Sequence, residues 1–240
     1  MYKDIINELH NKANQEKVKI LSSFFKTDKW WYWEWDKFLW IQVPDQRVVA
    51  KKYFQQCDFK DIEQLLKSKF HEIRLTGFLI LCYKYEYFTK KHNTSEQKLI
   101  VDFYVSHMDY ANNRDLVDLV SYKILWNYLF DKDRSLLYEL AKDTNMRKQR
   151  IAIVSTMAFV KKWDLNDTLK ISEMLLSHPH DLIHKAVGRL LREVWKQNEK
   201  VLKDFLDAHI NHISRTTLRY SIEHLDAISK AKYLNLKKSE

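Results

Sequence analysis

The sequence is short of the residues that interrupt regular secondary structure. Its 240 residues include only 2 Gly and 2 Pro, whereas average usage would give about 17 Gly in a chain of this length. This scarcity excludes a loop-rich β-sandwich, a collagen-like chain and a glycine-rich phosphate-binding fold. No run of 18 uninterrupted apolar residues occurs, and the first residues hold no apolar segment, so we expect neither a membrane span nor a signal peptide.

Cysteine is equally scarce. Cys57 and Cys82 lie 25 residues apart in apolar surroundings, without the C-x-x-C spacing of zinc or redox sites. We therefore expect buried free thiols rather than a disulfide or a zinc site. A reducing cytoplasm is the compartment that fits this usage.

The chain does contain abundant charge and abundant apolar residues. Lys and Arg number 41 against 32 Asp and Glu, which gives a formal net charge of +9. This excess favours a polyanion such as nucleic acid, or an anionic membrane surface, as the partner. With 45% hydrophobic residues, the chain is long and apolar enough to bury a core and is not disordered.

Apolar residues recur at steps of three and four along most of the chain. Over residues 183–194 they are Ile183, Val187, Leu190, Leu191 and Val194. Such steps indicate helices, and helix pairs follow one another roughly every 35 to 40 residues between 58 and 225. We predict an all-α fold, an α-solenoid of HEAT-like antiparallel helix pairs, forming a single domain over residues 1–240. On periodicity alone, an irregular all-α bundle is the alternative.

Four cations form one row on the helix expected near residues 181–197. They are Lys185, Arg189, Arg192 and Lys196, at offsets 0, 4, 7 and 11. Further basic clusters at 147–150 and 215–219 would add rows on neighbouring helices, and such rows suit a groove that follows a phosphate backbone. The alternative is a solvated face braced by Asp181–Lys185 and Arg189–Glu193 pairs at i, i+4.

Two carboxylates, Asp115 and Asp118, lie three residues apart in the segment NNRDLVDL. Carboxylates in the first turn of a helix often only complement the helix dipole. Opposite a basic groove, however, a carboxylate can stabilise a cationic transition state at a sugar and hold a water. The spacing leaves both interpretations open.

Two aromatic clusters also stand out. Five of the eight Trp fall within residues 30–40, which suits a stacking platform for bases or a membrane-interface patch. The second cluster is His178, His180 and His184. It lacks the Glu and the third ligand of a zincin motif, so we expect helix-terminal or packing histidines rather than a metal site.

Five segments, taken in order, match the pattern of one known family. They are DKFLWIQVPDQRVVAKKY at 36–53, NNRDLVDL at 112–119, RKQRIAIVSTMAFVKK at 147–162, DTLKISEMLLSHPHDLIHKAVGRLLREV at 167–194 and SRTTLRYSIEHLD at 214–226. Together they resemble the AlkD-type family of HEAT-like DNA glycosylases, the DNA alkylation repair proteins. The resemblance runs from about residue 28 to residue 234.

The resemblance implies an activity and the residues that perform it. Such proteins excise N3- and N7-alkylated purines from double-stranded DNA without a metal or nucleotide cofactor and without base flipping. It implies that Asp118 is the catalytic carboxylate and that two Trp cradling the lesion-bearing sugar correspond to Arg114 and Arg189. The DNA-binding residues that we expect are Arg150, Lys185, Arg192 and Arg215.

The prediction is therefore a monomeric DNA glycosylase that acts on duplex DNA containing alkylated purines. We expect it in the cytoplasm, associated with the nucleoid, with no cofactor and no membrane partner. The alternative is a non-catalytic HEAT-like scaffold for DNA or protein, a degenerate homologue in which Asp118 is only a helix-start residue.

The sequence departs from the family pattern by the same two exchanges at several positions. All eight Trp stand where the family usually has Gly, whereas Arg114, Arg147 and Arg189 stand where it usually has Trp. We hypothesise that UGA codons meant as Gly were read as Trp, and that some CGR codons meant as Trp were read as Arg. Glycine suits tight turns and helix ends that need a positive φ. The competing interpretation is a true homologue that lost its aromatic cradle.

Overall fold

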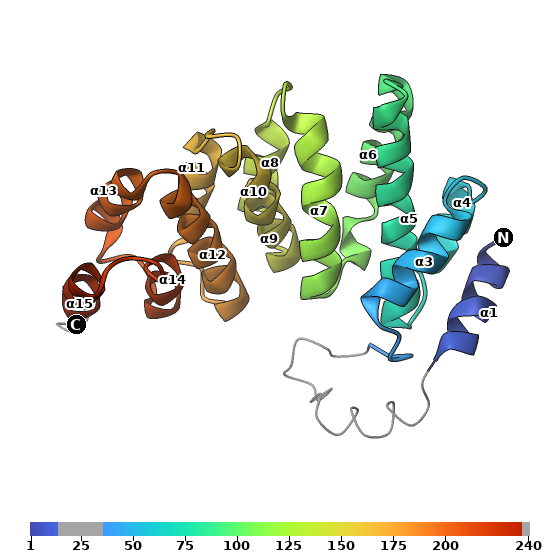
Figure 1. Ribbon diagram of the computed structural model, residues 1–240, viewed down its shortest axis with the longest axis horizontal. Helices are drawn as coiled ribbons and strands as arrows, with labels where there is room; N and C mark the ends of the chain where they lie inside the picture. Colours follow the sequence, from blue (N-terminus) through green and yellow to red (C-terminus); the bar gives the residue numbers. More distant parts are fainter. Residues whose placement is uncertain (14–35, 237–240) are drawn as a thin grey trace. The chain divides into compact units, whose positions relative to one another are not determined.

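The computed structural model describes residues 1–13 and 36–236 (Figure 1). These residues form helices without a named strand, and one isolated backbone bridge joins Lys37 to Phe70. The predicted all-α fold class is confirmed. The chain divides into two compact units, Met1–Val120 and Ser121–Glu240, and the boundary falls inside helix α7 (Arg114–Leu129). A single domain over the whole chain stays a prediction.

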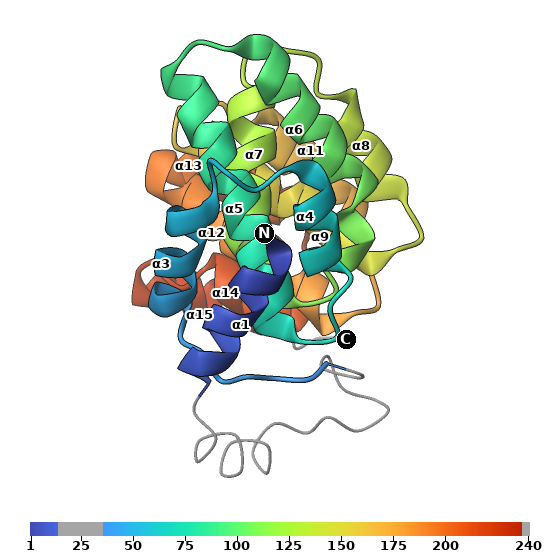
Figure 2. The same ribbon diagram turned by 90° about the vertical axis from the view of Figure 1, so that its right-hand side faces the viewer.

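The first unit is built around one long buried helix. Its elements before α7 are α1 (Tyr2–Lys12), α3 (Val43–Tyr53), α4 (Phe59–Leu66), α5 (His71–Lys90), α6 (Thr94–Ser106) and the 3-10 helix η1 (Met108–Tyr110). Helix α5 contacts α3, α4 and α6, and Figure 2 shows it between α3 and α4. Because neighbours cover it on several sides, α5 buries most of its surface rather than a single stripe.

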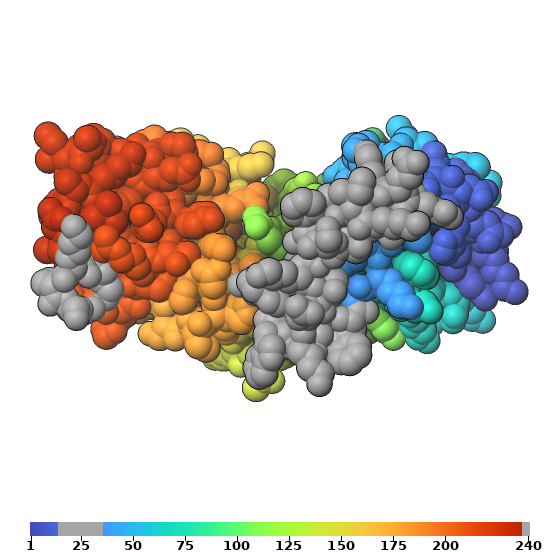
Figure 3. Space-filling model, turned by 90° about the horizontal axis from the view of Figure 1, so that it is seen from below, coloured from blue at the N-terminus to red at the C-terminus, as the bar shows by residue number. Residues whose placement is uncertain are grey.

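The second unit is built around α12. Its elements are α8 (Ser135–Lys142), α9 (Met146–Ser155), α10 (Met157–Val160), α11 (Asn166–Leu175), α12 (Asp181–Gln197), α13 (Glu199–His209), α14 (Arg215–Ser221) and α15 (Ala227–Leu236). Helix α12 contacts α9, α11, α13 and α14. In the space-filling view, orange atoms around α12 lie directly against the red atoms of the C-terminal helices (Figure 3).

Gly188 lies where α12 and α14 come close together. A Cβ atom at this position would lie 2.6 Å from Tyr220 Cβ and 2.7 Å from the Thr217 carbonyl oxygen. Any larger residue would therefore push α14 away from α12. The apolar stripe predicted for residues 183–194 is buried, and Gly188 lets that stripe pack tightly.

The two cysteines are buried free thiols, as predicted. Burial raises the pKa of the Cys57 thiol to about 12, so it stays protonated at neutral pH. In the part of the chain that the structure describes, no helix is long and apolar enough to cross a membrane.

Two Trp occupy backbone conformations that favour glycine. Trp40 has φ 59° and Trp163 has φ 67°, and His92, with φ 52°, is the third such non-Gly residue among those described. Trp163 follows α10 in the left-handed position of a helix C-terminus, where the next amide, that of Asp164, donates to the Phe159 carbonyl at 3.1 Å. These conformations support the hypothesis that glycine belongs at both Trp sites.

The remaining Trp do not provide the same support. Trp126 and Trp195 lie inside α7 and α12, in ordinary helical conformation. The other four, at positions 30, 31, 33 and 35, fall outside the described residues, as does most of the Trp cluster over residues 30–40.

Candidate functional site

The segment NNRDLVDL begins helix α7 through its own side chains. The Asn113 side-chain oxygen accepts the Arg114 amide at 2.7 Å, and Asp115 Oδ1 accepts the Leu116 amide at 2.9 Å. Amides in the first turn of a helix have no partner within the helix, and side-chain oxygens placed there satisfy them. The helix start predicted at this motif is confirmed.

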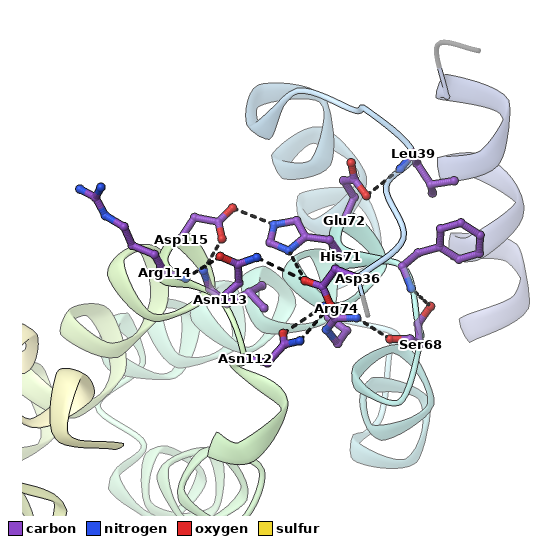
Figure 4. A network of polar contacts seen from close by, with 12 residues as sticks. Asp36, Leu39, Ser68, His71, Glu72, Arg74, Asn112, Asn113, Arg114 and Asp115 are labelled. Atoms are coloured by element: carbon purple, nitrogen blue, oxygen red, sulfur yellow. Dashed lines mark hydrogen bonds and ion pairs between the residues drawn. The ribbon is translucent and has the colours of Figure 1, made fainter. Parts of the chain in front are cut away.

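Asp118 lies one turn into α7 and is paired with Arg114. The Asp118 side chain is 12% exposed, and its Oδ2 lies 3.3 Å from Arg114 Nε. The Arg114 side chain is 55% exposed and points away from the buried side chains in Figure 4. The structure thus brings together two of the predicted site residues, and the cation of one meets the carboxylate of the other.

A buried polar network lies behind this first turn (Figure 4). At its centre is Asp36, whose side chain is 3% exposed. Asp36 Oδ1 accepts hydrogen bonds from Arg74 at 2.6 Å and from Asn112 at 2.8 Å. Its Oδ2 accepts one from Asn113 at 3.3 Å and lies 3.5 Å from His71 Nδ1. One carboxylate therefore fixes both asparagines that precede α7.

His71 connects Asp36 to α7. Its Nε2 lies 2.7 Å from Asp115 Oδ2. Burial disfavours the imidazolium, but the Asp115 and Asp36 carboxylates outweigh it and raise the pKa of His71 to about 9. Burial likewise disfavours the Asp36 carboxylate, but hydrogen bonding from His71 and the charge of Arg74 lower the pKa of Asp36 to about 2. Both groups are therefore charged at neutral pH.

A second buried carboxylate holds the segment that carries Asp36. Glu72, the second residue of α5, accepts the backbone amides of Leu39 at 2.9 Å and Trp40 at 2.7 Å. The His71 amide donates to the Lys37 carbonyl at 2.8 Å. Residues 36–40 are thereby attached to the start of α5, which places Asp36 next to the start of α7.

Arg150 is buried in the second unit. It lies in α9 with 3% of its surface exposed, and its guanidinium donates to the Leu182 carbonyl at 2.5 Å. It therefore ties α9 to the first turn of α12. In this arrangement the guanidinium acts inside the protein, and its predicted contact with DNA stays a prediction.

The other predicted DNA-binding cations lie at the surface, with protein partners. Lys185 pairs with Asp181 at 2.6 Å, one turn away on α12, so this part of the braced-face alternative is present. Arg192 pairs with Glu223, and Arg215 donates to the Leu234 carbonyl at 3.1 Å. Exposed ion pairs contribute only about 0–1 kcal/mol, so a phosphate can displace a carboxylate from such a pair.

The comparisons with known proteins point to one family. A sequence model of the family described as DNA alkylation repair enzyme matches residues 5–225. The chain belongs to this family. Its membership confirms the AlkD-type resemblance and gives this repair protein a role in DNA alkylation repair, with DNA as its partner.

Two solved structures share the fold of this chain. One is described as a predicted DNA alkylation repair enzyme from Enterococcus faecalis; it is 15% identical over 90% of this chain and 98% of its own, with a TM-score of 0.67. AlkD2 from Streptococcus mutans is 15% identical over 89% of this chain and 99% of its own, with a TM-score of 0.61. At this identity the likeness shows the fold alone. No curated protein sequence matches the chain significantly.

The three clustered histidines of the repair protein serve the start of α12. The His180 ring accepts the Leu182 amide at 3.1 Å, and the His178 ring accepts the His180 amide at 3.0 Å. The His184 ring contacts the His178 carbonyl. The predicted helix-terminal role is confirmed. Among the described residues no group of three His, Cys, Asp or Glu side chains is arranged to hold a metal.

Four buried charged residues of the repair protein were not predicted from the sequence. They are Asp36, His71, Glu72 and Arg74. The available signal was three ionisable side chains at 71, 72 and 74, directly before the apolar stretch of α5. Charged residues in a buried helix need partners, and Asp36 and the α7 motif supply them. Arg189, at the second cradle position, lies half-buried on α12.

Proposed function

We propose that this repair protein is a monomeric DNA glycosylase that hydrolyses the N-glycosidic bond of N3- and N7-alkylated purines in duplex DNA. The observation that carries the proposal is the position of Asp118. Its carboxylate lies one turn into α7 and is 12% exposed. The polar side chains just before it, Asn113 and Asp115, are held by hydrogen bonds. A carboxylate held in a fixed position can stabilise a positive charge that develops next to it in the transition state.

The chemistry requires little more than this carboxylate. An N3- or N7-alkylated purine is already cationic, so it leaves with the bonding electrons as a neutral base and needs no general acid. Positive charge then develops at the sugar, where Asp118 stabilises it electrostatically. The same carboxylate orients a water whose oxygen bonds to the anomeric carbon and whose proton is released. No step calls for a metal or a nucleotide cofactor.

Binding to the DNA backbone falls to the basic residues. Lys185, Arg192 and Arg215 lie at or near the surface of the second unit, in ion pairs or hydrogen bonds that a phosphate can replace. Phosphate contacts supply most of the non-specific affinity for duplex DNA. Arg150 takes part as a fourth contact if its guanidinium exchanges the Leu182 carbonyl for a phosphate.

The decisive experiment compares Asp118→Asn with its parent on duplex DNA containing N7-methylguanine. The substitution keeps the shape and removes the charge, so excision should fall by about 10² or more. Affinity for the DNA should stay equal or rise slightly, since a negative charge leaves a polyanion site. The matched control is Asp131→Asn, the same change at an exposed position, which should excise at the parental rate.

The non-catalytic scaffold gives the opposite result. If neither the parent nor a variant with Trp at positions 114 and 189 releases base from methylated DNA, the glycosylase proposal fails. It also fails if Asp118→Asn excises as fast as its parent. In both cases Asp118 is only a helix-start residue.

A further inference from the structure

Three ionisable side chains, two of them buried, form a continuous chain behind the first turn of α7. Asp36 lies 3.5 Å from His71 Nδ1, and His71 Nε2 lies 2.7 Å from Asp115 Oδ2. The side chains of Asp36 and His71 are 3% and 5% exposed, and that of Asp115 is 38% exposed. The chain thus runs from the protein interior to the surface at the point where α7 begins (Figure 4).

Protonated His71 supplies the second cation of this cluster, beside Arg74. The charged groups that face His71 are Asp36 from the segment before α3, Asp115 from α7 and Glu72 from its own helix, and Arg74 is paired with Asp36. Glu72 accepts two backbone amides, while Arg74 and His71 are the two cations that face the other two carboxylates, Asp36 and Asp115. Removing a buried cation from such a group leaves an uncompensated charge, which is strongly unfavourable.

The cluster also determines how α7 is rotated at its start. Asp36 holds Asn112 and Asn113, while His71 holds Asp115. Asp118 lies one turn beyond Asp115 on the same helix, where residues three apart share a face. Fixing the first turn therefore fixes the direction of the Asp118 carboxylate. A displacement of about 1 Å at a reacting group can cost about 10² in rate.

We propose that the side-chain chain Asp36–His71–Asp115 positions Asp118 for catalysis, with His71 as the positioning residue at its centre. This inference rests on the proposed glycosylase function. His71 does not contact the substrate; it acts through Asp115 and the first turn of α7. Deprotonation of His71 removes its positive charge and leaves one ring N–H for two carboxylates, which weakens the hold on Asp115, loosens that turn and lowers the rate without changing the affinity for DNA.

The test measures single-turnover excision of N7-methylguanine between pH 6 and 10, with background release by Asp118→Asn subtracted. The parental rate should fall at alkaline pH with a midpoint near 9, the pKa of His71. His71→Gln should be slower by about tenfold at pH 7, should lack the alkaline fall, and should bind DNA within about twofold of the parent. The matched control is His212→Gln, at an exposed histidine, which should keep the parental rate and profile.

A double variant separates positioning from a general effect on the fold. If His71 acts through Asp118, adding His71→Gln to Asp118→Asn should change the residual rate by less than about twofold. If His71→Gln fails to fold, Asp115→Asn takes its place. It keeps the side-chain shape but weakens the hold on the imidazolium, so the alkaline fall should move to lower pH.

Hydrogen exchange tests the same contact without relying on activity. After correction for intrinsic rates, the amides of residues 114–118 should exchange faster above pH 9 in the parent and at all pH values in His71→Gln. If neither the parent nor the variant with Trp at positions 114 and 189 excises base, the glycosylase proposal fails, and hydrogen exchange alone then decides whether His71 holds this turn. Three results would each overturn the positioning role. His71→Gln could keep the parental rate and pH profile, or it could lower the excision rate equally in the parent and in Asp118→Asn. The third is unchanged hydrogen exchange at residues 114–118.

Discussion

Arg114 and Asp118 form an ion pair across the first turn of α7, with Arg114 Nε 3.3 Å from Asp118 Oδ2. The guanidinium partly neutralises the carboxylate that we propose as the catalytic group. Asp118 is 12% exposed and Arg114 is 55% exposed, so the pair sits at the surface, where substrate would approach. The residue at position 114 therefore influences both the charge at Asp118 and what packs beside it.

Replacing Arg114 with Trp should raise the rate of excision. The change frees the Asp118 carboxylate and supplies an indole that can pack on a sugar. Arg114→Gln removes only the ion pair, so its rate should lie between those of the parent and Arg114→Trp. Single-turnover release of N7-methylguanine measures all three, and a rate for Arg114→Trp below the parental one would contradict the argument.

Replacing Trp163 with Gly should stabilise the protein by about 1 kcal/mol, because a left-handed conformation costs a non-Gly residue about that much or more. Trp163 has φ 67°, and its indole is largely exposed, so little packing is lost. The matched control is Trp195→Gly, inside α12, which should destabilise by about 1 kcal/mol. Urea unfolding measures both changes, and a loss of stability in Trp163→Gly would count against a glycine site.

The genetic-code hypothesis makes a separate prediction about the native protein. Mass spectrometry of the protein isolated from its source should find Gly at all eight Trp positions, and the gene should carry UGA at each of them. Codons 114, 147 and 189 should be CGR. Ordinary UGG codons at the Trp positions would contradict the hypothesis.

Gly188→Ala should destabilise the second unit by about 3 kcal/mol, within the range expected for overpacking. The added Cβ would meet Tyr220 Cβ at 2.6 Å and the Thr217 carbonyl oxygen at 2.7 Å, and the carbonyl cannot move without α14. Gly77→Ala is the control. Its Cβ would meet leucine side chains at 3.1 Å, which can shift, so its smaller cost should be partly offset by better helix propensity. Equal effects in urea unfolding would contradict this explanation.

The buried network should make stability depend on pH at both ends of the range. The pKa of His71 is raised from 6.5 to about 9, so its contribution is complete below pH 6.5 and lost as pH rises through 9. The pKa of Asp36 is lowered from 3.8 to about 2, so its contribution is complete above pH 3.8 and lost as pH falls through 2.

The free energy of unfolding should therefore decline between pH 6.5 and 9 in the parent. His71→Gln should be less stable at pH 6 and should show a smaller decline. Urea unfolding at half-unit pH intervals measures this. A decline of the same size in both proteins would show that another group titrates there.

Affinity for undamaged duplex DNA should fall steeply with salt. If roughly 4 to 6 phosphates are contacted, log K against log salt should slope by about −4 to −5. Lys185→Ala and Arg192→Ala should each flatten the slope by about one unit. Lys200→Ala, at a highly exposed lysine on α13, should leave it unchanged. If the affinity does not depend on salt, the row of cations on α12 is only a solvated face and does not bind DNA.

The sequence by itself determined the features that depend on near neighbours. Apolar residues that recur every three and four positions indicate helices, and because Gly and Pro are scarce, long helices continue without interruption. The start of α7 follows from Asn113, whose side chain caps the adjacent amide. The ion pairs Arg114–Asp118 and Lys185–Asp181 join residues one turn apart on a helix, so spacing alone brings them together.

Tertiary structure decided the contacts between residues distant in the chain. Asp115 meets His71 across 44 positions and Arg150 meets Leu182 across 32, and no local pattern specifies such partners. Arg150 belongs to a basic segment with the composition of a surface, yet it is buried because α9 packs against the start of α12. Burial in turn sets the charge of His71, since the low-dielectric interior strengthens its interaction with two carboxylates. The sequence therefore provides the carboxylate at position 118, and packing provides the buried charges that hold it in place.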